Sequence, residues 1–315
     1  MTSFLTLGNM KKEEIFYLIE LAQAIKKQPL KYKDRLANKI VLMIFEKPSL
    51  RTRASFDVAV KQLGGDTTII EKQDMPLGKE SIEDTAKVSS RYYDAIVARL
   101  FKHDDLVKLA ENSTIPVING LTNEHHPVQI LSDLLTIYEK FIVKDNASDF
   151  KDLKLCFLGD GFNNITHSLI QGCAIAGMNI SVGCPSKFMP DLEIITGAKK
   201  LAQASGIKLF ITSDPVAAIK DTDIVYADSW MSYHVPKSEE EERIKTFMPY
   251  QINAKIVKHA KTNFIFMNCL PAMRGYEQTA EIIDGEHSIV FDQAENRLHM
   301  QKALLLWLLN ADKIK

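Results

Sequence analysis

Short, almost purely apolar runs recur along the chain and are separated by segments with helical periodicity. The first run, KIVLMIF at 39–45, is typical of a strand that is buried on both faces of a parallel sheet. The same pattern predicts strands at 94–100, 116–120, 153–159, 179–185, 207–213, 223–228, 264–268 and 288–292. Because parallel strands are joined by crossover helices, the sequence predicts an α/β fold.

The chain is long enough for two domains, since 315 residues exceed what one hydrophobic core usually supports. Helices are predicted at 11–26, 31–38 and 294–310, and the segment 131–150 is expected to be a long helix followed by a polar link. We place the domain boundary at that link. One domain is therefore expected over 1–135 and the other over 150–296, each a parallel sheet flanked by helices. The last helix is apolar on one side, so about 297–315 is expected to pack back on the first domain.

Composition indicates a folded protein, with 46% hydrophobic and 25% charged residues. The formal net charge of −1 predicts neither nucleic-acid nor membrane-surface binding. No apolar run reaches the roughly 18 residues of a membrane span and the first residues lack a signal-peptide core, so a cytoplasmic location is expected.

The four cysteines are widely spaced, with no histidine placed to complete a metal site. They are expected to be thiols, most of them buried.

A polar turn, Glu46-Lys47-Pro48-Ser49-Leu50-Arg51-Thr52-Arg53, directly follows the first predicted strand. Phe56, Val60 and Leu63 then mark the buried face of a helix. The N-terminus of a helix favours an anion, and the hydroxyl and guanidinium groups of this turn suit phosphate oxygens. By pattern alone, a phosphate site and a serine N-cap beside exposed arginines are equally compatible with the turn.

The sequence Ser49-x-Arg51-Thr52-Arg53 resembles the phosphate-binding signature that aspartate and ornithine carbamoyltransferases share. The resemblance implies that Ser49, Arg51 and Thr52 hold the phosphate of carbamoyl phosphate. Leu50 stands where threonine is usual, which removes one hydroxyl but keeps the backbone N–H.

Further matches concern the carbamoyl donor, whose carbonyl oxygen gains negative charge when an amine attacks. Arg99 ends a predicted strand, and the segment from His126 to Gln129 (His-Pro-Val-Gln) resembles the family's His-Pro-x-Gln motif. The resemblance implies that Arg99, His126 and Gln129 surround that carbonyl. Arg297 matches the family's last arginine, which reaches the carbamoyl phosphate.

The second predicted domain opens with the turn Gly159-Asp160-Gly161-Phe162-Asn163-Asn164. A dinucleotide site would have a third glycine where Asn164 stands, so the signal for NAD is weak and no cofactor is expected. The turn resembles the family's Gly-Asp-x-x-Asn-Asn segment instead. That resemblance implies that Asn164 binds the amino acid substrate.

The segment Asp228-Ser229-Trp230-Met231-Ser232 matches the Asp-x-Trp-x-Ser of ornithine carbamoyltransferases. The match implies that Asp228 holds the α-amino group of ornithine and that Ser232 belongs to a loop that closes over the substrate. Tyr233-His234 replaces the usual Met-Gly of this loop. The replacement leaves the identity of the amine open, with Tyr233 counted among the substrate-binding candidates.

Asn268-Cys269-Leu270-Pro271 resembles the family's His-Cys-Leu-Pro, with asparagine in place of histidine. The resemblance implies that Cys269 lies beside the carbamoyl group and the side-chain amine, and that the carbonyl of Leu270 orients both. Aspartate enzymes of the family have a different segment here, so Cys269 favours ornithine.

The segment 77–86 resembles the family loop that reaches into a neighbouring subunit's site. It implies a homo-oligomer, a trimer or a multiple of one, with sites at subunit interfaces. Pro76 stands where a glutamine or histidine would contact the neighbour's phosphate, and Lys79 is a candidate replacement.

In collinear order, the matches cover about 40 to 310, and the chain is identified as a member of the aspartate/ornithine carbamoyltransferase family. The resemblance implies transfer of the carbamoyl group from carbamoyl phosphate to the δ-amine of L-ornithine, giving L-citrulline and phosphate in arginine metabolism. A sister enzyme using putrescine or an N-acylated ornithine is the first alternative. Aspartate carbamoylation, an NAD-dependent dehydrogenase and a non-catalytic member are more remote.

Overall fold

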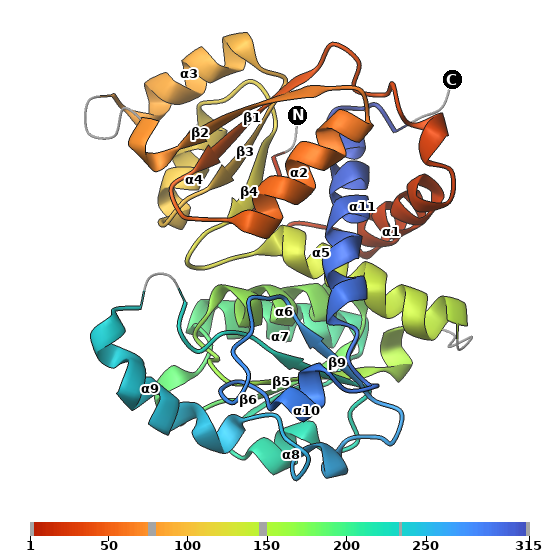
Figure 1. Cartoon of the computed structure of the whole chain (residues 1–315), viewed down its shortest axis with the longest axis vertical. Coiled ribbons are helices and arrows are strands. Elements are labelled where there is room, and N and C mark those ends of the chain that lie inside the picture. The colour runs from red at the N-terminus through yellow and green to blue at the C-terminus, as the bar shows by residue number, and fades with distance from the viewer. Residues whose placement is uncertain (1–2, 75–79, 145–149, 233–234, 313–315) are drawn as a thin grey trace. The chain divides into compact units, whose positions relative to one another are not determined.

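The computed structural model describes residues 3–74, 80–144, 150–232 and 235–312. The chain forms two compact units, one over Met1–Leu135 with Glu295–Lys315 and the other over Thr136–Ala294. Each unit contains a parallel sheet flanked by helices (Figure 1). The predicted α/β class is therefore confirmed.

The sheet of the first unit has the strand order β2-β1-β3-β4, with every neighbouring pair parallel. Its strands are β1 (Ile40–Phe45), β2 (Asp66–Glu71), β3 (Ala95–Arg99) and β4 (Val117–Leu121). Its helices are α1 (Lys12–Lys27), α2 (Leu50–Gln62), α3 (Ile82–Tyr92), α4 (His103–Glu111), most of α5 (Pro127–Ile137) and, from Glu295 on, α11 (Val290–Leu308). In α11, Lys302 donates a hydrogen bond to Gln62 of α2, so the last helix packs on the first unit, as predicted.

The sheet of the second unit has the order β7-β6-β5-β8-β9, again all parallel. Its strands are β5 (Lys154–Leu158), β6 (Asn179–Gly183), β7 (Leu209–Thr212), β8 (Ile224–Ala227) and β9 (Ile265–Asn268). Its helices are a π-helix at Tyr138–Lys144, α6 (Asn164–Ala176), α7 (Leu192–Ser205), α8 (Pro215–Ile219), α9 (Glu240–Phe247) and α10 (Ala280–Ile283).

In each sheet the strand order reverses between two central strands, β1 and β3 in the first unit and β5 and β8 in the second. Ligands of open α/β sheets bind outside the carboxyl ends of the strands at such a reversal. The turns after these four strands begin near Glu46, Leu100, Gly159 and Asp228. Most of the predicted site residues therefore lie at the edges where this architecture places ligands.

Two predicted elements were wrong, and one strand was missed. The segment predicted as a helix at 31–38 is a short 3₁₀ helix at Pro29–Lys31 followed by turns. Tyr32 and Leu36 are both buried, and their spacing of four residues led to the helical prediction. The predicted strand at 288–292 is reduced to an isolated bridge between Ser288 and Phe266, and α11 begins at Val290. A short apolar run does not distinguish a strand from the start of a helix. The prediction omitted β2, an edge strand whose residues are only partly buried.

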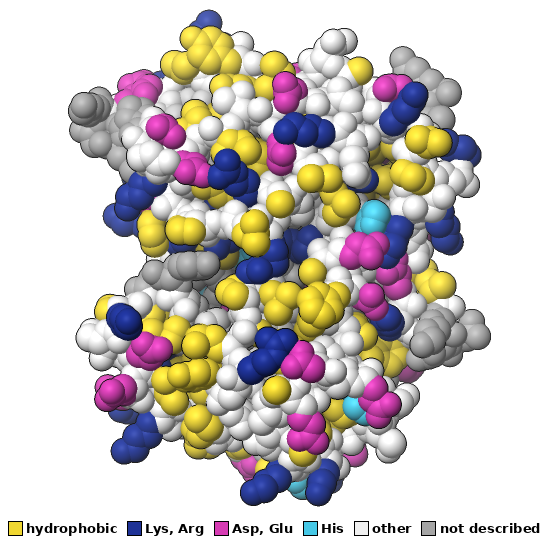
Figure 2. All heavy atoms as spheres, in the orientation of Figure 1, with side chains coloured by type: hydrophobic (Ala, Val, Ile, Leu, Met, Phe, Trp, Pro, Cys, Tyr) yellow, Lys and Arg dark blue, Asp and Glu magenta, His cyan; other side chains and the backbone are white. Residues whose placement is uncertain are grey.

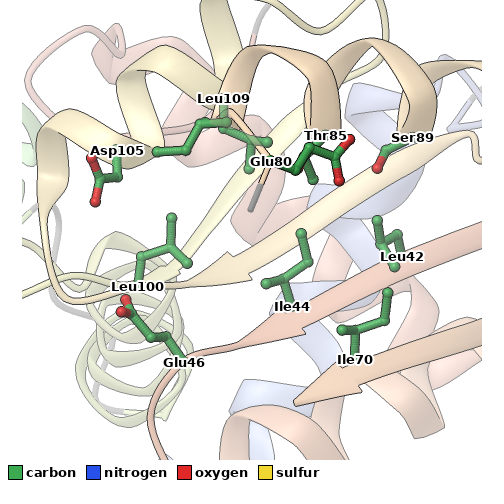
Figure 3. A pocket seen from close by; sticks show the side chains of 11 residues that line it. Leu42, Ile44, Glu46, Ile70, Glu80, Thr85, Ser89, Leu100, Asp105 and Leu109 are labelled. Atoms are coloured by element: carbon green, nitrogen blue, oxygen red, sulfur yellow. The ribbon is translucent and has the colours of Figure 1, made fainter. Parts of the chain in front are cut away.

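A cavity of about 110 Å³ lies between the first sheet and helices α3 and α4 (Figure 3). Leu42 and Ile44 of β1 contribute apolar walls, as do Leu100, which follows β3, and Leu109 of α4. Within the part of the chain that the structure describes, none of the predicted site residues lines this cavity.

The face shown in Figure 2 carries lysine and arginine side chains interspersed with aspartate and glutamate, in line with the formal net charge of −1. Among the described residues, no helix is long and apolar enough to cross a membrane. All four cysteines are free thiols, three of them buried, as predicted.

Candidate active site

The turn after β1 presents a helix N-terminus together with polar side chains. Ser49 is the N-cap of α2 in an extended conformation, and its hydroxyl makes no capping hydrogen bond. Leu50 is 79% exposed, so its side chain packs on little and its backbone N–H is what it can offer a ligand. Arg51 is half-buried and Thr52 is buried in the following turn. The turn can therefore bind an anion through backbone N–H, hydroxyl and guanidinium groups.

Arg297 of α11 connects this turn to α5, although the three segments are far apart in the sequence. Its Nη2 donates a hydrogen bond to Oγ1 of Thr52 at 3.0 Å, and its Nη1 donates to Oε1 of Gln129. Gln129 in turn donates from Nε2 to Oδ1 of Asp133 at 2.8 Å. Arg297, Thr52 and Gln129, which were predicted from separate motifs, thus form one hydrogen-bonded group.

The electrostatics of this group favour an anionic ligand. His126 is buried, and its pKa lies well below the ordinary value of 6.5 because of burial and the surrounding cations Arg297, Arg99, Lys47 and Arg51. The imidazole is therefore neutral at pH 7 and can donate a hydrogen bond to a carbonyl oxygen without adding charge. The four cations suit the charge of a phosphate group.

Lys47 belongs to the same group, and the sequence prediction did not select it. It is 3% exposed, its Nζ lies 4.5 Å from the centroid of the Phe101 ring, and it donates a hydrogen bond to Asn123. Burial and the charge of Arg99 lower the pKa of Lys47 to about 8. The only sequence signal was its place between a buried strand and the Ser49 turn, where a lysine usually faces solvent.

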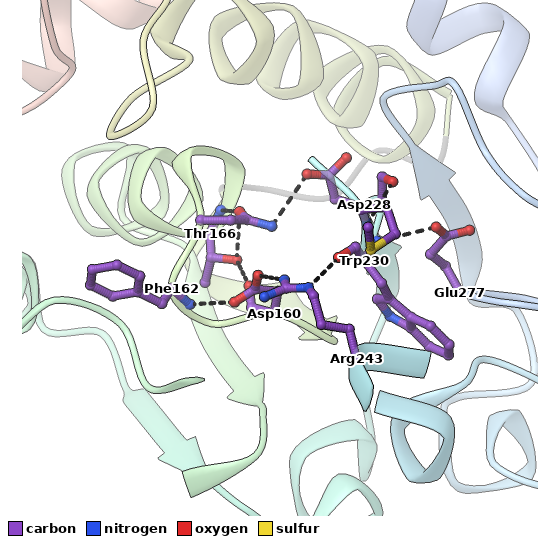
Figure 4. A network of polar contacts seen from close by, with 10 residues as sticks. Asp160, Phe162, Thr166, Asp228, Trp230, Arg243 and Glu277 are labelled. Atoms are coloured by element: carbon purple, nitrogen blue, oxygen red, sulfur yellow. Dashed lines mark hydrogen bonds and ion pairs between the residues drawn. The ribbon is translucent and has the colours of Figure 1, made fainter. Parts of the chain in front are cut away.

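In the second unit, three predicted segments meet at Asp228. Asp228 follows β8 and is 8% exposed (Figure 4). The thiol of Cys269, which follows β9, donates to Oδ1 of Asp228 at 3.0 Å. Nδ2 of Asn163, the N-cap of α6, donates to Oδ2 at 3.3 Å. Asn164 is the first residue of α6 and is 9% exposed.

Asn163 is a second functional candidate that the sequence prediction did not select. Its Oδ1 accepts the backbone N–H of Thr166 at 2.8 Å, which caps α6 and leaves its amide N–H₂ directed at Asp228. The Asn-x-x-Thr spacing was a signal for this cap. Asn163 therefore fixes the orientation of a carboxylate that can bind an amine.

The replacement of the usual histidine by Asn268 has a structural counterpart. Asn268 is fully buried, and its Oδ1 accepts the backbone N–H of Leu270 at 2.8 Å. Leu270 has a φ of 56°, in the left-handed region that residues other than glycine rarely adopt. Asn268 thus helps hold the backbone whose carbonyl was predicted to orient the substrates.

The remaining predicted residues belong to the segment after Asp228 and to the segment around 76–79. Ser232 is half-buried in the loop after β8, where its carbonyl accepts the N–H of Val235 at 2.9 Å. Tyr233 and His234, and the loop positions Pro76 and Lys79, lie outside the described residues. Within the described parts of the chain, no group of three His, Cys, Asp or Glu side chains is placed to hold a metal ion.

Both units match family descriptions along most of their length. Residues 2–139 match the carbamoyl-P binding domain of aspartate/ornithine carbamoyltransferase, and residues 151–308 match the Asp/Orn binding domain. The chain belongs to the aspartate/ornithine carbamoyltransferase family. The resemblance inferred from the sequence motifs is thereby confirmed.

Relatives within this family cover nearly the whole chain. An ornithine carbamoyltransferase of Methanocaldococcus jannaschii is 46% identical over 302 residues, which are 95% of this chain and 96% of that protein. One from Bacillus cereus is 47% identical over 303 residues, or 96% and 92% of the two chains. The solved ornithine carbamoyltransferase of Pyrococcus furiosus is 43% identical, with a TM-score of 0.92 and coverage of 100% and 98%. None of these matches supports the dehydrogenase alternative.

Proposed function

We propose that this protein transfers the carbamoyl group of carbamoyl phosphate to the δ-amine of L-ornithine, forming L-citrulline and phosphate. The observation that carries the choice of acceptor is the buried carboxylate of Asp228, which accepts hydrogen bonds from Cys269 and Asn163. A carboxylate at this place attracts an ammonium group and would repel the side chain of aspartate. Family membership and the names of the relatives support the same reaction.

The first unit is the proposed donor site. Ser49, Arg51 and Thr52, with the N–H groups that begin α2, bind the phosphate, and Leu50 contributes through its backbone. Arg99, His126 and Gln129 donate hydrogen bonds to the carbamoyl oxygen, and Arg297 holds Gln129 and Thr52 in place. These donors stabilise the negative charge that forms on that oxygen during attack.

The second unit is the proposed acceptor site. Asn164, Asp228 and Ser232 bind the α-amino acid end of ornithine, and Tyr233 belongs to the same loop as Ser232. Cys269 and the carbonyl of Leu270 orient the δ-amine. The amine must be neutral to attack, although its pKa in water is about 10.4 by analogy with lysine, so the site selects the minor deprotonated form.

In the reaction, the δ-nitrogen forms a bond to the carbonyl carbon and the carbon–oxygen bond to phosphate then breaks. Phosphate leaves with the proton that the amine loses, so no side chain is required as a general base. Positioning of the two substrates contributes much of the rate enhancement, since the effective molarity of well-oriented reactants lowers a barrier by roughly 7 to 11 kcal/mol.

We infer further that the enzyme is a cytoplasmic homotrimer, or a multiple of one, that serves arginine biosynthesis. The likeness of the segment 77–86 to a loop shared between subunits supports the oligomer. Light scattering of the purified protein tests it.

The test of the acceptor is turnover with carbamoyl phosphate and a panel of amines: L-ornithine, putrescine, N-acetylornithine and L-aspartate. The proposal predicts that L-ornithine gives the highest kcat/KM. A higher kcat/KM for putrescine or N-acetylornithine would assign the enzyme to a sister activity and identify Tyr233-His234 as the specificity signal.

A further inference from the structure

A buried glutamate, Glu277, contacts the two loops that carry the proposed acceptor residues. Glu277 lies in the turn between β9 and α10 and is 2% exposed. Its Oε1 accepts the backbone N–H of Trp230 at 3.2 Å, and its Oε2 accepts the backbone N–H of Met273 at 3.0 Å. Trp230 follows Asp228 after β8, and Met273 follows Cys269 and Leu270 after β9.

Trp230, one of the two residues whose backbone N–H Glu277 binds, is also fixed at its carbonyl. The carbonyl of Trp230 accepts a hydrogen bond from Nε of Arg243 at 2.8 Å (Figure 4). Arg243 is buried, forms an ion pair with Asp160 of the turn after β5, and stacks on Phe188 and Phe247. A continuous chain of contacts thus links the loops after β5, β8 and β9.

The residue after Glu277 acts on the same loop. The side chain of Gln278 is fully buried, and its Nε2 donates to the carbonyl of Met273 at 3.3 Å. Its Oε1 accepts from Nδ2 of Asn268 at 3.1 Å, and Asn268 in turn holds the N–H of Leu270. The dipeptide Glu277-Gln278 therefore anchors the loop after β9 at Asn268 and at Met273.

The position of Glu277 is energetically expensive. Burial raises the pKa of Glu277 and the nearby charge of Asp228 adds to this, whereas its backbone N–H partners lower the pKa. Within the described part of the chain no cation pairs with it, so backbone N–H groups offset the cost of burying the carboxylate. A neutral side chain would avoid the desolvation of a charge but could not accept both N–H groups, which indicates a role for the two equivalent acceptor oxygens.

We propose that Glu277 is a positioning residue of the ornithine site, whose carboxylate fixes the spacing between the loop of Asp228 and the loop of Cys269 and Leu270. This inference rests on the proposed function. Two loops spaced in this way keep the thiol of Cys269 within 3.0 Å of Asp228. Glu277 itself touches no substrate in this account.

The variant Glu277→Gln tests the proposal, because a carboxamide has one acceptor oxygen and sets its N–H₂ against the second backbone N–H. We expect the KM for ornithine to rise about tenfold or more, because one backbone N–H is left without an acceptor. The KM for carbamoyl phosphate should stay unchanged. A merely structural glutamate would lower thermal stability and the active fraction without shifting either KM. Glu281→Gln, which removes an exposed carboxylate four residues later, is the matched control and should behave as wild type.

A second measurement needs no variant. Amide hydrogen exchange of the wild-type protein should show Trp230 and Met273 N–H among the protected amides of their loops, with further protection when ornithine and phosphate are present. Exchange of both amides as fast as that of exposed loop residues would overturn the proposal even if Glu277→Gln does not fold.

Wild-type turnover in the same assay separates the two claims. Absence of turnover with ornithine would overturn the proposed function and, with it, the assignment of Glu277 to an ornithine site. Wild-type turnover combined with an unchanged ornithine KM in Glu277→Gln would overturn the Glu277 assignment alone.

Discussion

The thiol of Cys269 donates a hydrogen bond to Oδ1 of Asp228 at 3.0 Å, and the two residues are separated by 41 positions in the sequence. The contact exists because β8 and β9 are parallel neighbours whose carboxyl ends lie at the same edge of the sheet. It orients a buried carboxylate beside a polarisable sulfur. We take this pair as the core of the proposed acceptor site.

Removal of the thiol should weaken ornithine binding. In Cys269→Ala, Asp228 keeps the hydrogen bond from Asn163 but loses the one at Oδ1. The carboxylate is then less firmly oriented, so kcat/KM for ornithine should fall about tenfold while the KM for carbamoyl phosphate stays unchanged. Cys269→Ser keeps a donor at the same place and should retain more activity than the alanine variant. Equal steady-state constants for wild type and Cys269→Ala would contradict this role.

Substitution of Arg297 should affect the donor site. Lysine keeps the charge in Arg297→Lys but cannot donate to Thr52 and Gln129 with one planar fork. We expect kcat to fall about a hundredfold, as for the loss of a preorganised donor near a developing oxyanion. Arg91→Lys, at an exposed position of α3, is the control. A kcat for Arg297→Lys within twofold of wild type would exclude a preorganising role.

Anion binding to the first unit should depend on pH through Lys47. Its pKa is lowered to about 8, so the side chain is charged below pH 8 and becomes neutral above it. Affinity for sulfate, whose own charge is constant in this range, should be highest below pH 8 and should fall as pH rises through 8, by at most about tenfold per pH unit. Calorimetric titration from pH 6.5 to 9.5 measures this slope.

Two variants identify Lys47 as the group responsible. In Lys47→Met the dependence around pH 8 should disappear, whereas Lys108→Met, at an exposed lysine of α4, should leave it intact. A slope that persists in Lys47→Met would assign the titration to another group.

Gly159 and Gly197 should respond to alanine with opposite signs. At Gly159, with a φ of 138°, a Cβ would lie 3.2 Å from Nε1 of Trp230, so Gly159→Ala should lower the free energy of unfolding by about 1–3 kcal/mol. At Gly197, inside α7, a Cβ meets nothing within 4 Å, so Gly197→Ala should raise it by about 0.5–1 kcal/mol. Urea unfolding of both variants measures the two shifts. Equal effects would contradict a close approach of the Trp230 ring to Gly159.

Strands of the sheet interiors could be predicted because their burial on both faces requires near-continuous apolar sequence, as in β1 and β3. The same reasoning missed β2, where an edge position tolerates Thr67 and Thr68 beside Ile69 and Ile70. It also turned the start of α11 into a strand, since the three apolar residues at 289–291 are too few to show a period.

Site residues at strand ends could be proposed from motifs, but their mutual contacts could not. The hydrogen bond from Arg297 to Thr52 joins positions 245 residues apart and depends on the packing of α11. Lys47 was overlooked because its lowered pKa comes from burial, which the residue type alone does not reveal. Glu277 was overlooked for a similar reason: a glutamate in a polar turn usually faces solvent.

Citrulline formation from carbamoyl phosphate and L-ornithine, measured for the wild-type protein and for Arg51→Gln, tests the proposed reaction and the proposed phosphate site together. We expect turnover by the wild type and its loss in the variant, because glutamine removes the charge and planar fork expected to hold the phosphate. Absence of citrulline with the wild-type protein, or equal turnover by Arg51→Gln, would contradict the proposed reaction or the proposed phosphate site, respectively.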